Sequence, residues 1–225
     1  MSNRGFHTVT LGCKLNQFDT AAIEGELTHR GYVRAASPER AEIVIVNTCT
    51  VTAKADADAR RLIRGIRRAN VGCRLLVTGC YAELEADAIT AIPGVDRVFG
   101  NRDKPALAGI LDALGARPRS SDAGAGSTAS PSGSTRGDRG CEAGLDLPDA
   151  LHFGSRSRAF LKVQEGCDLV CSYCVIPRVR GASRSVPATR VRDAMRSLFD
   201  RGFREVVLTG VNTGDWGKDL EPRSD

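Results

Sequence analysis

Ile43-Val44-Ile45-Val46-Asn47-Thr48-Cys49-Thr50 is the stretch of sequence that decides the fold. Its first four residues form a continuous β-branched run, which is typical of a strand buried on both faces of a parallel sheet. Strand-like apolar runs also occur at Phe6 to Leu11 and at Leu75 to Val77. The segments between these runs are long enough for helices, so the sequence predicts a βαβ array.

Helical patterns fill the segments that follow the strands. After the first strand, apolar residues recur at helical spacing up to Gly31, a residue that commonly ends a helix. We therefore expect helices at about residues 16–30, 52–69, 83–91 and 104–114, and a further strand at 95–99. The expected fold class is α/β, with a doubly wound parallel-sheet domain over residues 1–116.

Three cysteines follow strands of this predicted sheet. Cys13, Cys49 and Cys80 each come directly after the carboxyl end of a strand. Since parallel strands end at the same edge, and open α/β sheets bind ligands there, the three thiols can converge on one spot. Any one of them could instead be a small buried hydrophobic residue. The shared placement of all three favours a metal centre with three cysteine ligands.

A second group of cysteines lies in the loop after an apolar run at Ala159 to Val163. Cys167, Cys171 and Cys174 have C-x3-C-x2-C spacing, and the loop offers no good fourth iron ligand. Fully ligated iron–sulfur clusters use four thiolates, so three suggest a 4Fe–4S cluster with one iron open to a small molecule. A zinc knuckle or a chance grouping is the alternative, but the nearby His152 is poorly spaced for a knuckle.

Composition places these sites in a globular chain. The 225 residues include 41% hydrophobic and 26% charged residues, and the net charge is +5, which permits a nucleic-acid partner. No apolar run approaches the roughly 20 residues of a membrane span, so we expect a cytoplasmic protein. Of the eight cysteines, Cys73 precedes its strand and Cys141 lies apart from the others, and both are interpreted as structural or incidental.

Residues 117–150 interrupt the pattern. They consist mostly of Ser, Gly, Ala, Asp, Pro and Arg, which cannot bury enough apolar surface to offset the entropy of ordering. We interpret them as a flexible linker. Residues 151–225 then begin a second domain with the cysteine loop, a helix at about 189–201 whose apolar stripe includes Met195 and Phe199, and a strand at 205–208.

The cysteine motifs and their flanks resemble those of the radical S-adenosylmethionine (SAM) methylthiotransferases. The resemblance rests on Leu161 to Cys167, on Cys174-Val175-Ile176-Pro177 and on Arg180-Gly181 and Arg184-Ser185. It extends to the first domain through the Leu11-Gly12-Cys13-Lys14-Leu15-Asn16-Gln17, Asn47-Thr48-Cys49-Thr50-Val51-Thr52 and Thr78-Gly79-Cys80-Tyr81-Ala82 motifs. These motifs are most similar to those of the subgroup that methylthiolates N6-threonylcarbamoyladenosine in tRNA.

This resemblance implies two 4Fe–4S clusters and SAM as cofactors. Cys167, Cys171 and Cys174 would hold the cluster that binds and reductively cleaves SAM, and Cys13, Cys49 and Cys80 would hold the auxiliary cluster that carries the inserted sulfur. The radical formed from SAM would remove hydrogen from C2 of the modified adenine, and a second SAM would supply the methyl group.

The resemblance also implies contacts for other residues. Tyr173 would lie beside the adenine of SAM, Gly210 near its methionine end, and Arg180 and Arg184 against the tRNA. The implied partners are tRNA and an electron-donor protein. Members of this family have a complete radical SAM barrel, of which residues 151–225 would supply only the beginning. We therefore expect a truncated chain that is inactive alone.

Three other functions compete with this one. The chain could act on a related substrate, either isopentenyladenosine in tRNA or an aspartate of a ribosomal protein. It could be a metal-binding scaffold without catalysis, for zinc or an iron–sulfur cluster. It could also be a simple RNA-binding module, although that function leaves the six placed thiols unexplained.

Overall fold

The computed structural model describes residues 4–115, 145, 147–148, 151–154 and 157–220. Its N-terminal part has strands β1 (Gly5–Thr10), β2 (Val33–Arg34), β3 (Ile43–Thr48), β4 (Arg74–Gly79) and β5 (Arg97–Val98). The helices of this part are α1 (Lys14–His29), α2 (Ala53–Ala69), α3 (Cys80–Leu84), α4 (Ala86–Thr90) and α5 (Leu107–Ala113), with short 3-10 helices η1 (Pro38–Arg40) and η2 (Lys104–Ala106).

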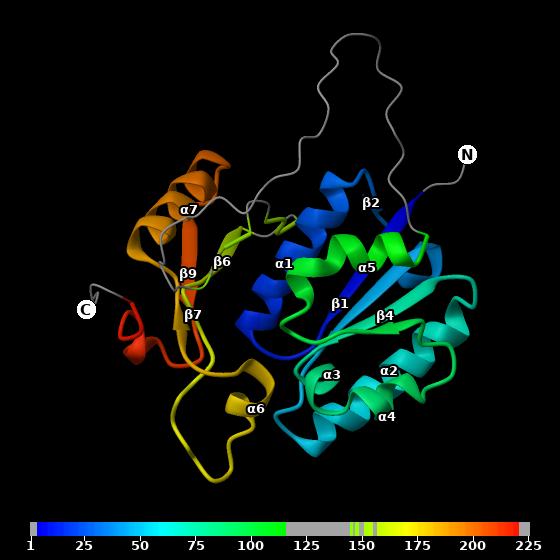
Figure 1. Cartoon of the computed structure of the whole chain (residues 1–225). Coiled ribbons are helices and arrows are strands. Elements are labelled where there is room, and N and C mark those ends of the chain that lie inside the picture. Colours follow the sequence, from blue (N-terminus) through cyan, green and yellow to red (C-terminus); the bar gives the residue numbers. More distant parts are fainter. Residues whose placement is uncertain (1–3, 116–144, 146, 149–150, 155–156, 221–225) are drawn as a thin grey trace, which may run out of the picture.

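The five strands form one parallel sheet in the order β2-β1-β3-β4-β5. Alternate residues of β3 point to opposite faces, so Val44 and Val46 pack toward α2 while Ile43 and Ile45 pack toward α1 and α5. Helices thus cover both faces of the sheet (Figure 1). This arrangement confirms the predicted α/β doubly wound fold.

The C-terminal part has β6 (Arg158–Lys162), β7 (Gln164–Glu165), α6 (Ile176–Arg180), β8 (Arg184–Ser185), α7 (Ala188–Asp200), β9 (Glu205–Thr209) and the 3-10 helix η3 (Thr213–Asp215). Strands β6 and β9 pair in parallel and α7 connects back between them, so the three make a βαβ unit. Strands β7 and β8 pair antiparallel at the base of the cysteine loop.

Helix α1 lies between the five-stranded sheet and the β6-β9 pair (Figure 1). Its Ile23 and Leu27 pack on the five-stranded sheet, whereas Phe18 and Ala21 join a second core with residues of β6 and α7. Leu147, which falls within the predicted linker 117–150, is also buried in this second core. The predicted flexible character of the other linker residues, and Cys141 with them, falls outside the described residues.

The structure corrects three sequence-based expectations. The helix predicted at 83–91 is two short helices, α3 and α4, and it starts earlier, at Cys80. The strand predicted at 95–99 is only two residues long. Met195 and Phe199, predicted to be core residues of α7, are 40% and 59% exposed because the described elements cover only the Val191 and Leu198 side of that helix. Among the described residues, no helix is both long enough and apolar enough to cross a membrane.

Candidate metal centres

Cys13, Cys49 and Cys80 lie along one edge of the five-stranded sheet. They follow β1, β3 and β4, which are neighbours, and Thr10, Asn47 and Thr78 lie in register at the ends of these strands. Neighbouring strands are about 4.8 Å apart, so the two outer strand ends are separated by only about 10 Å. The edge includes the point between β1 and β3 where the strand order reverses, which is the usual ligand-binding position of such sheets.

The Cys49 thiol lies within electrostatic reach of the other two thiols. Burial raises the pKa of Cys49 against hydrogen bonds from the backbone of Val51 and Thr50, and the neighbouring Cys80 and Cys13 raise it further. Cys49 and Cys80 are buried, while Cys13 is exposed at the start of α1. The structure therefore places two inner thiols and one outer thiol at a common edge.

Two glycines allow the close approach of these cysteine segments. Gly12 has a φ of +98°, and a Cβ on it would lie 2.8 Å from the Cys49 sulfur. Gly79 has a φ of +102°, and a Cβ there would overlap the backbone of Thr48. Since both positions require a left-handed conformation and no side chain, glycine keeps the space beside the thiols open.

Cys167, Cys171 and Cys174 lie in the loop between β7 and α6. The loop closes at its base, where the Cys167 amide donates to the Gly181 carbonyl at 3.0 Å and the Ser183 amide donates to Asp168 Oδ1 at 2.9 Å. A turn within the loop is closed by the Cys174 amide, which donates to the Cys171 carbonyl at 3.0 Å. All three cysteines are at least partly exposed, so this group is accessible to a small molecule.

Among the residues that the structure describes, no three His, Cys, Asp or Glu side chains are gathered closely enough to hold a metal ion. Cluster binding at the six cysteines therefore stays a prediction. The thiolate donor sets and the space kept open by Gly12 fit iron–sulfur ligation with three thiolates at each centre.

Cys73 lies away from both groups. It precedes β4 at the opposite edge of the sheet, is buried, and its thiol donates to the Asn70 carbonyl at 3.3 Å. This environment agrees with the structural role predicted for it.

A buried amide, Gln164, connects the cysteine loop to the end of β9. Its Oε1 accepts hydrogen bonds from the amides of Val211 and Asn212, both at 2.9 Å. Its Nε2 donates to the Gly166 carbonyl at 2.8 Å and to Ser183 Oγ at 3.0 Å. Gly210, predicted to lie near SAM, adjoins this amide, since a Cβ on Gly210 would be 3.0 Å from Gln164 Oε1. Gln164 thus fixes the backbone on both sides of the predicted SAM site.

Five charged side chains form a buried network between the two parts. Asp19 of α1 accepts from Lys104 at 2.8 Å, from Lys162 at 3.0 Å and from Arg180 at 3.3 Å. Glu165 accepts from Lys162 at 3.1 Å and from Arg180 at 2.5 Å. All five side chains are at most 10% exposed. With three cations and two carboxylates, the network carries one surplus positive charge.

The pKa shifts reflect this balance of charge. Burial alone would raise the pKa of Asp19, but Lys104, Lys162 and Arg180 together hold it well below its usual range. Burial lowers the pKa of Lys104 more than Asp19 raises it. For Lys162, which faces both carboxylates, the opposite holds: burial lowers its pKa, but Asp19 and Glu165 raise it more. Asp19 is therefore ionised at neutral pH and is the main counter-charge of the network.

Arg180 does not have the environment expected of a tRNA contact. It is 3% exposed, and besides the two carboxylates its Nη2 donates to Asn16 Oδ1 at 2.6 Å. Burial lowers the pKa of Arg180, but Asp19, Cys80, Glu165 and Cys13 raise it more. The guanidinium is thus held by protein groups beside the sheet edge with Cys13, Cys49 and Cys80, which we call the first cysteine edge. This environment corrects the expectation that Arg180 meets a tRNA phosphate.

Two asparagines complete the connection between α6 and the first cysteine edge. The Asn16 side chain donates to the carbonyls of Leu11 at 2.7 Å and Thr48 at 2.9 Å, just ahead of Cys13 and Cys49. The Asn101 side chain donates to the Val179 carbonyl at 2.8 Å, and its nitrogen lies 3.8 Å from the Cys80 sulfur. The end of α6 is therefore tied to the backbone or the sulfur of all three cysteine segments.

The two remaining predicted contacts lie at the surface. Tyr173 is 89% exposed on the cysteine loop, so its ring is free of protein packing. The Arg184 guanidinium is half exposed and lies 3.5 Å from Glu165. These positions leave a SAM contact for Tyr173 and a tRNA contact for Arg184 as predictions.

Apart from Arg180, which was predicted for another role, sequence patterns did not identify the network residues or the amides that accompany them. One signal was available: Lys162, Gln164 and Glu165 are polar residues at the end of an apolar run that leads directly into the cysteine loop. Polar side chains in such a position must find buried partners. The partners Asn16, Asp19, Asn101 and Lys104 carry no comparable signal, because their segments look like ordinary polar helix faces and loops.

Comparison with known proteins places the chain among relatives with named activities. Residues 5–100 match a sequence family described as "Uncharacterized protein family UPF0004". The chain is 38% identical over 221 residues to the threonylcarbamoyladenosine tRNA methylthiotransferase MtaB of Bacillus subtilis (strain 168), a match that covers 98% of this chain and 46% of that protein.

Two further relatives show similar coverage. The threonylcarbamoyladenosine tRNA methylthiotransferase MtaB of Aquifex aeolicus (strain VF5) is 34% identical, over 93% of this chain and 48% of that protein. The tRNA-2-methylthio-N(6)-dimethylallyladenosine synthase of Geobacter sulfurreducens is 33% identical, over 97% of this chain and 47% of that protein. The chain thus spans about half the length of these relatives.

Proposed function

Because this chain is related to the methylthiotransferases along nearly its whole length, we propose that it is part of a tRNA methylthiotransferase that adds a methylthio group to C2 of N6-threonylcarbamoyladenosine. The observation that carries the proposal is that a chain related to these enzymes also contains two groups of three cysteines. One group lies at the ligand-binding edge of a doubly wound sheet, and the other lies in the loop after the first strand of a βαβ unit.

The six cysteines are the proposed ligands of two 4Fe–4S clusters, Cys13, Cys49 and Cys80 for one and Cys167, Cys171 and Cys174 for the other. When bound, these clusters supply the electron for SAM cleavage and an iron site for the inserted sulfur. The exposed Tyr173 and the Gly210 turn are the proposed SAM contacts, and Arg184 is a proposed tRNA contact.

The protein's own residues position these two centres. Arg180, at the end of the helix after the second cysteine loop, binds Asn16, which holds the strand ends before Cys13 and Cys49. Gln164 fixes the loop base against the β9 end. These contacts set the geometry of the two cysteine groups, and burial of the network excludes water from the space between α1 and β7.

An electron-donor protein and tRNA are the proposed partners. We place the reaction in the cytoplasm, where reducing conditions keep thiols unpaired, and all seven cysteines that the structure describes are free.

A related tRNA substrate is the second candidate. The dimethylallyladenosine-modifying relative is nearly as similar to this chain as the relative from Aquifex aeolicus. The assay must therefore compare both products.

Anaerobic reconstitution tests the cluster part of the proposal. The chain should bind about eight irons with matching sulfide, as expected of two four-iron clusters. Adding SAM should change the electron paramagnetic resonance of the cluster that is lost on Cys174→Ala, and leave that of the other. A colourless protein that binds only zinc would show that the chain is a metal scaffold of another kind.

Nucleoside mass spectrometry tests the reaction. Cells that lack the gene would be complemented with this chain, or with a version extended to the length of its relatives. The methylthio form of threonylcarbamoyladenosine should return with the extended version. Return of only the dimethylallyladenosine product would establish the second candidate.

A further inference from the structure

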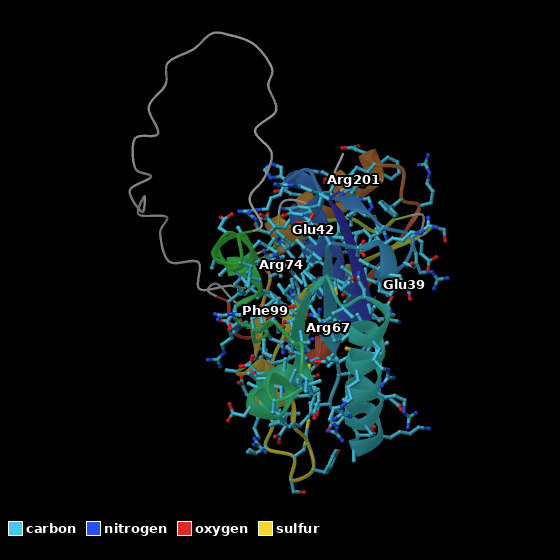
Figure 2. All side chains as sticks on the ribbon, turned by 90° about the vertical axis from the view of Figure 1, so that its right-hand side faces the viewer. Glu39, Glu42, Arg67, Arg74, Phe99 and Arg201 are labelled. Carbon is cyan, nitrogen blue, oxygen red and sulfur yellow. The ribbon has the colours of Figure 1, made fainter. Side chains whose placement is uncertain are left out.

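One face of α2 concentrates the positive charge of the chain. The helix contains six basic residues and two acidic ones, a net charge of +4, while the whole chain has +5. Arg60, Arg61, Arg64 and Arg68 lie one turn or less apart on the side away from the buried residues Ala59, Ile63 and Ile66. We call these four arginines the α2 basic face. Figure 2 looks toward α2 at the surface of the molecule.

The α2 basic face is largely unneutralised. Among the described residues its ion pair is Arg61 with Asp58 at 3.6 Å, and both of these side chains are exposed. Arg60 donates to the Tyr81 hydroxyl instead of a carboxylate. Arg67, by contrast, is tied down by Asp96 and by the carbonyls of Val71 and Cys73, so it is a structural residue and does not belong to the face.

This accumulation weakens the helix. Like charges three or four residues apart repel, and Arg64 has such neighbours in Arg60, Arg61 and Arg68. Other interactions stabilise the helix: the Thr52 side chain accepts a hydrogen bond from the Ala55 amide, and the apolar stripe of α2 is buried. The exposed Arg61–Asp58 pair offsets this repulsion only in part, and the repulsion that remains points to an anionic partner.

The shape of the face suits a phosphate backbone. The arginines and Ala57 line an open hollow of about 390 Å³. Arg60, Arg64 and Arg68 are spaced by four residues, so the row extends about 12 Å at 1.5 Å per residue. One strand of a duplex presents a phosphate about every 3.4 Å of axis. The row therefore spans between three and four phosphate spacings of such a strand.

An acidic protein fits the face less well. Protein interfaces depend on buried aromatic or apolar anchors surrounded by a polar rim. The lining of this hollow offers only Ala57 besides the arginines. Phosphate contacts need no such anchor, since they consist of charge and hydrogen bonds.

The face leads toward the first cysteine edge. Helix α2 begins a few residues after Cys49, and Arg60 contacts Tyr81, the neighbour of Cys80. At the other end of α2, the labelled Arg67 lies toward the edge where Arg74 and Glu42 mark the starts of β4 and β3 (Figure 2). We propose that the α2 basic face binds the phosphate backbone of the RNA substrate and directs it to the edge with Cys13, Cys49 and Cys80. This proposal rests on the proposed function for the identity of the RNA.

Fluorescence anisotropy with a labelled, unmodified tRNA anticodon stem–loop tests this on the cluster-free 225-residue chain. The variant Arg61→Gln/Arg64→Gln/Arg68→Gln should bind about tenfold or more weakly at 50 mM KCl. Its slope of log K against log KCl should be smaller by about 2 to 3, since three phosphate contacts are lost. Because repulsion is relieved, its urea midpoint should be equal to or above that of the parent chain, which separates lost binding from lost folding.

The matched control removes the same charge from α7 and the loop after it, as Arg192→Gln/Arg196→Gln/Arg204→Gln, at three exposed positions. The control should keep the parent affinity and slope. Equal weakening by both variants would overturn the proposal, because binding would then follow total charge. The proposal would also be overturned if the α2 variant bound RNA as the parent chain does but bound a flavodoxin, an acidic redox protein, more weakly. Absence of clusters on reconstitution would overturn the proposed function while leaving this RNA result intact.

Discussion

Removing the Asp19 carboxylate should destabilise the protein more than any charge removal at its surface. In the variant Asp19→Asn the network keeps three cations, Lys104, Lys162 and Arg180, but only the carboxylate of Glu165. The surplus charge of the buried cluster rises from +1 to +2. The asparagine oxygen can still accept a hydrogen bond, so the loss is mainly electrostatic.

The magnitude follows from burial. The Asp19 side chain is 4% exposed and its three cations are at most 10% exposed, so solvent screens the charges little. Breaking a buried ion pair by removing one partner costs about 3–5 kcal/mol. This is a large part of a total stability of about 5–15 kcal/mol. For a chain of this size, it corresponds to a fall in Tm of roughly 6–20 °C.

Urea unfolding at pH 7 gives the measurement, with Asp193→Asn as the matched control. Asp193 loses the same charge but is exposed, with Arg196 at 3.7 Å, so its loss should change stability by at most about 1 kcal/mol. If the free energies of unfolding of the two variants differ by less than about 1 kcal/mol, the view that the network stabilises the contact between the N-terminal and C-terminal parts is refuted.

Acid pH provides a second check on the same variant. The folded pKa of Asp19 lies well below its unfolded value, so its stabilisation is complete above about pH 5 and is lost as the pH falls toward the folded pKa. The parent chain should therefore lose stability below about pH 5, and the gap to Asp19→Asn should narrow. A gap that stays constant down to pH 3 would contradict the low pKa of Asp19.

Three further predictions concern the cysteine edges. Cys13→Ala should lower the iron content of the reconstituted chain by about half, whereas Cys73→Ala should leave the iron content unchanged. Equal losses of iron in both variants would contradict the assignment of Cys13 as a ligand and Cys73 as a structural residue. Gly12→Ala should cost about 1–3 kcal/mol in urea unfolding because of its left-handed φ and the contact with Cys49, and an unchanged midpoint would contradict the tight packing there. Gln164→Ala should cost about 2–4 kcal/mol and speed hydrogen exchange at the amides it accepts from; unchanged exchange would show that the buried amide does not hold the β9 loop.

The first cysteine edge could be predicted because local patterns determine it. β-branched runs such as Ile43 to Val46 identify buried parallel strands, and parallel strands place everything that follows them at one edge. Cys13, Cys49 and Cys80 therefore lie at one edge of the sheet whatever the details of the helices. The helix at 83–91 was wrong for a local reason as well, since Cys80 starts a new helix directly at the strand end, before the apolar periodicity becomes visible.

The exposed residues of α7 show the limit of periodicity. Met195 and Phe199 continue the apolar stripe of Val191 and Leu198, and the pattern alone predicts that all four are buried. Periodicity identifies a face that can be buried, but not which elements cover it. In the structure α7 packs against β6, which reaches only one side of the stripe.

The charged network lies beyond sequence reasoning for a related reason. On α1, Asn16 and Asp19 alternate with the apolar residues Leu15 and Phe18, which is the pattern of a helix with one wet face. They are buried because α1 lies between two sheets, and their partner Arg180 is 161 residues away from Asp19 along the chain. A polar residue on a helix carries no mark of such a distant partner. The charge balance is nevertheless a consequence of the fold. Because the β6-β9 pair covers α1, the buried Asp19 carboxylate must be paired with cations. One of these cations is Arg180, which holds α6 at the sheet edge where Cys13, Cys49 and Cys80 follow their strands.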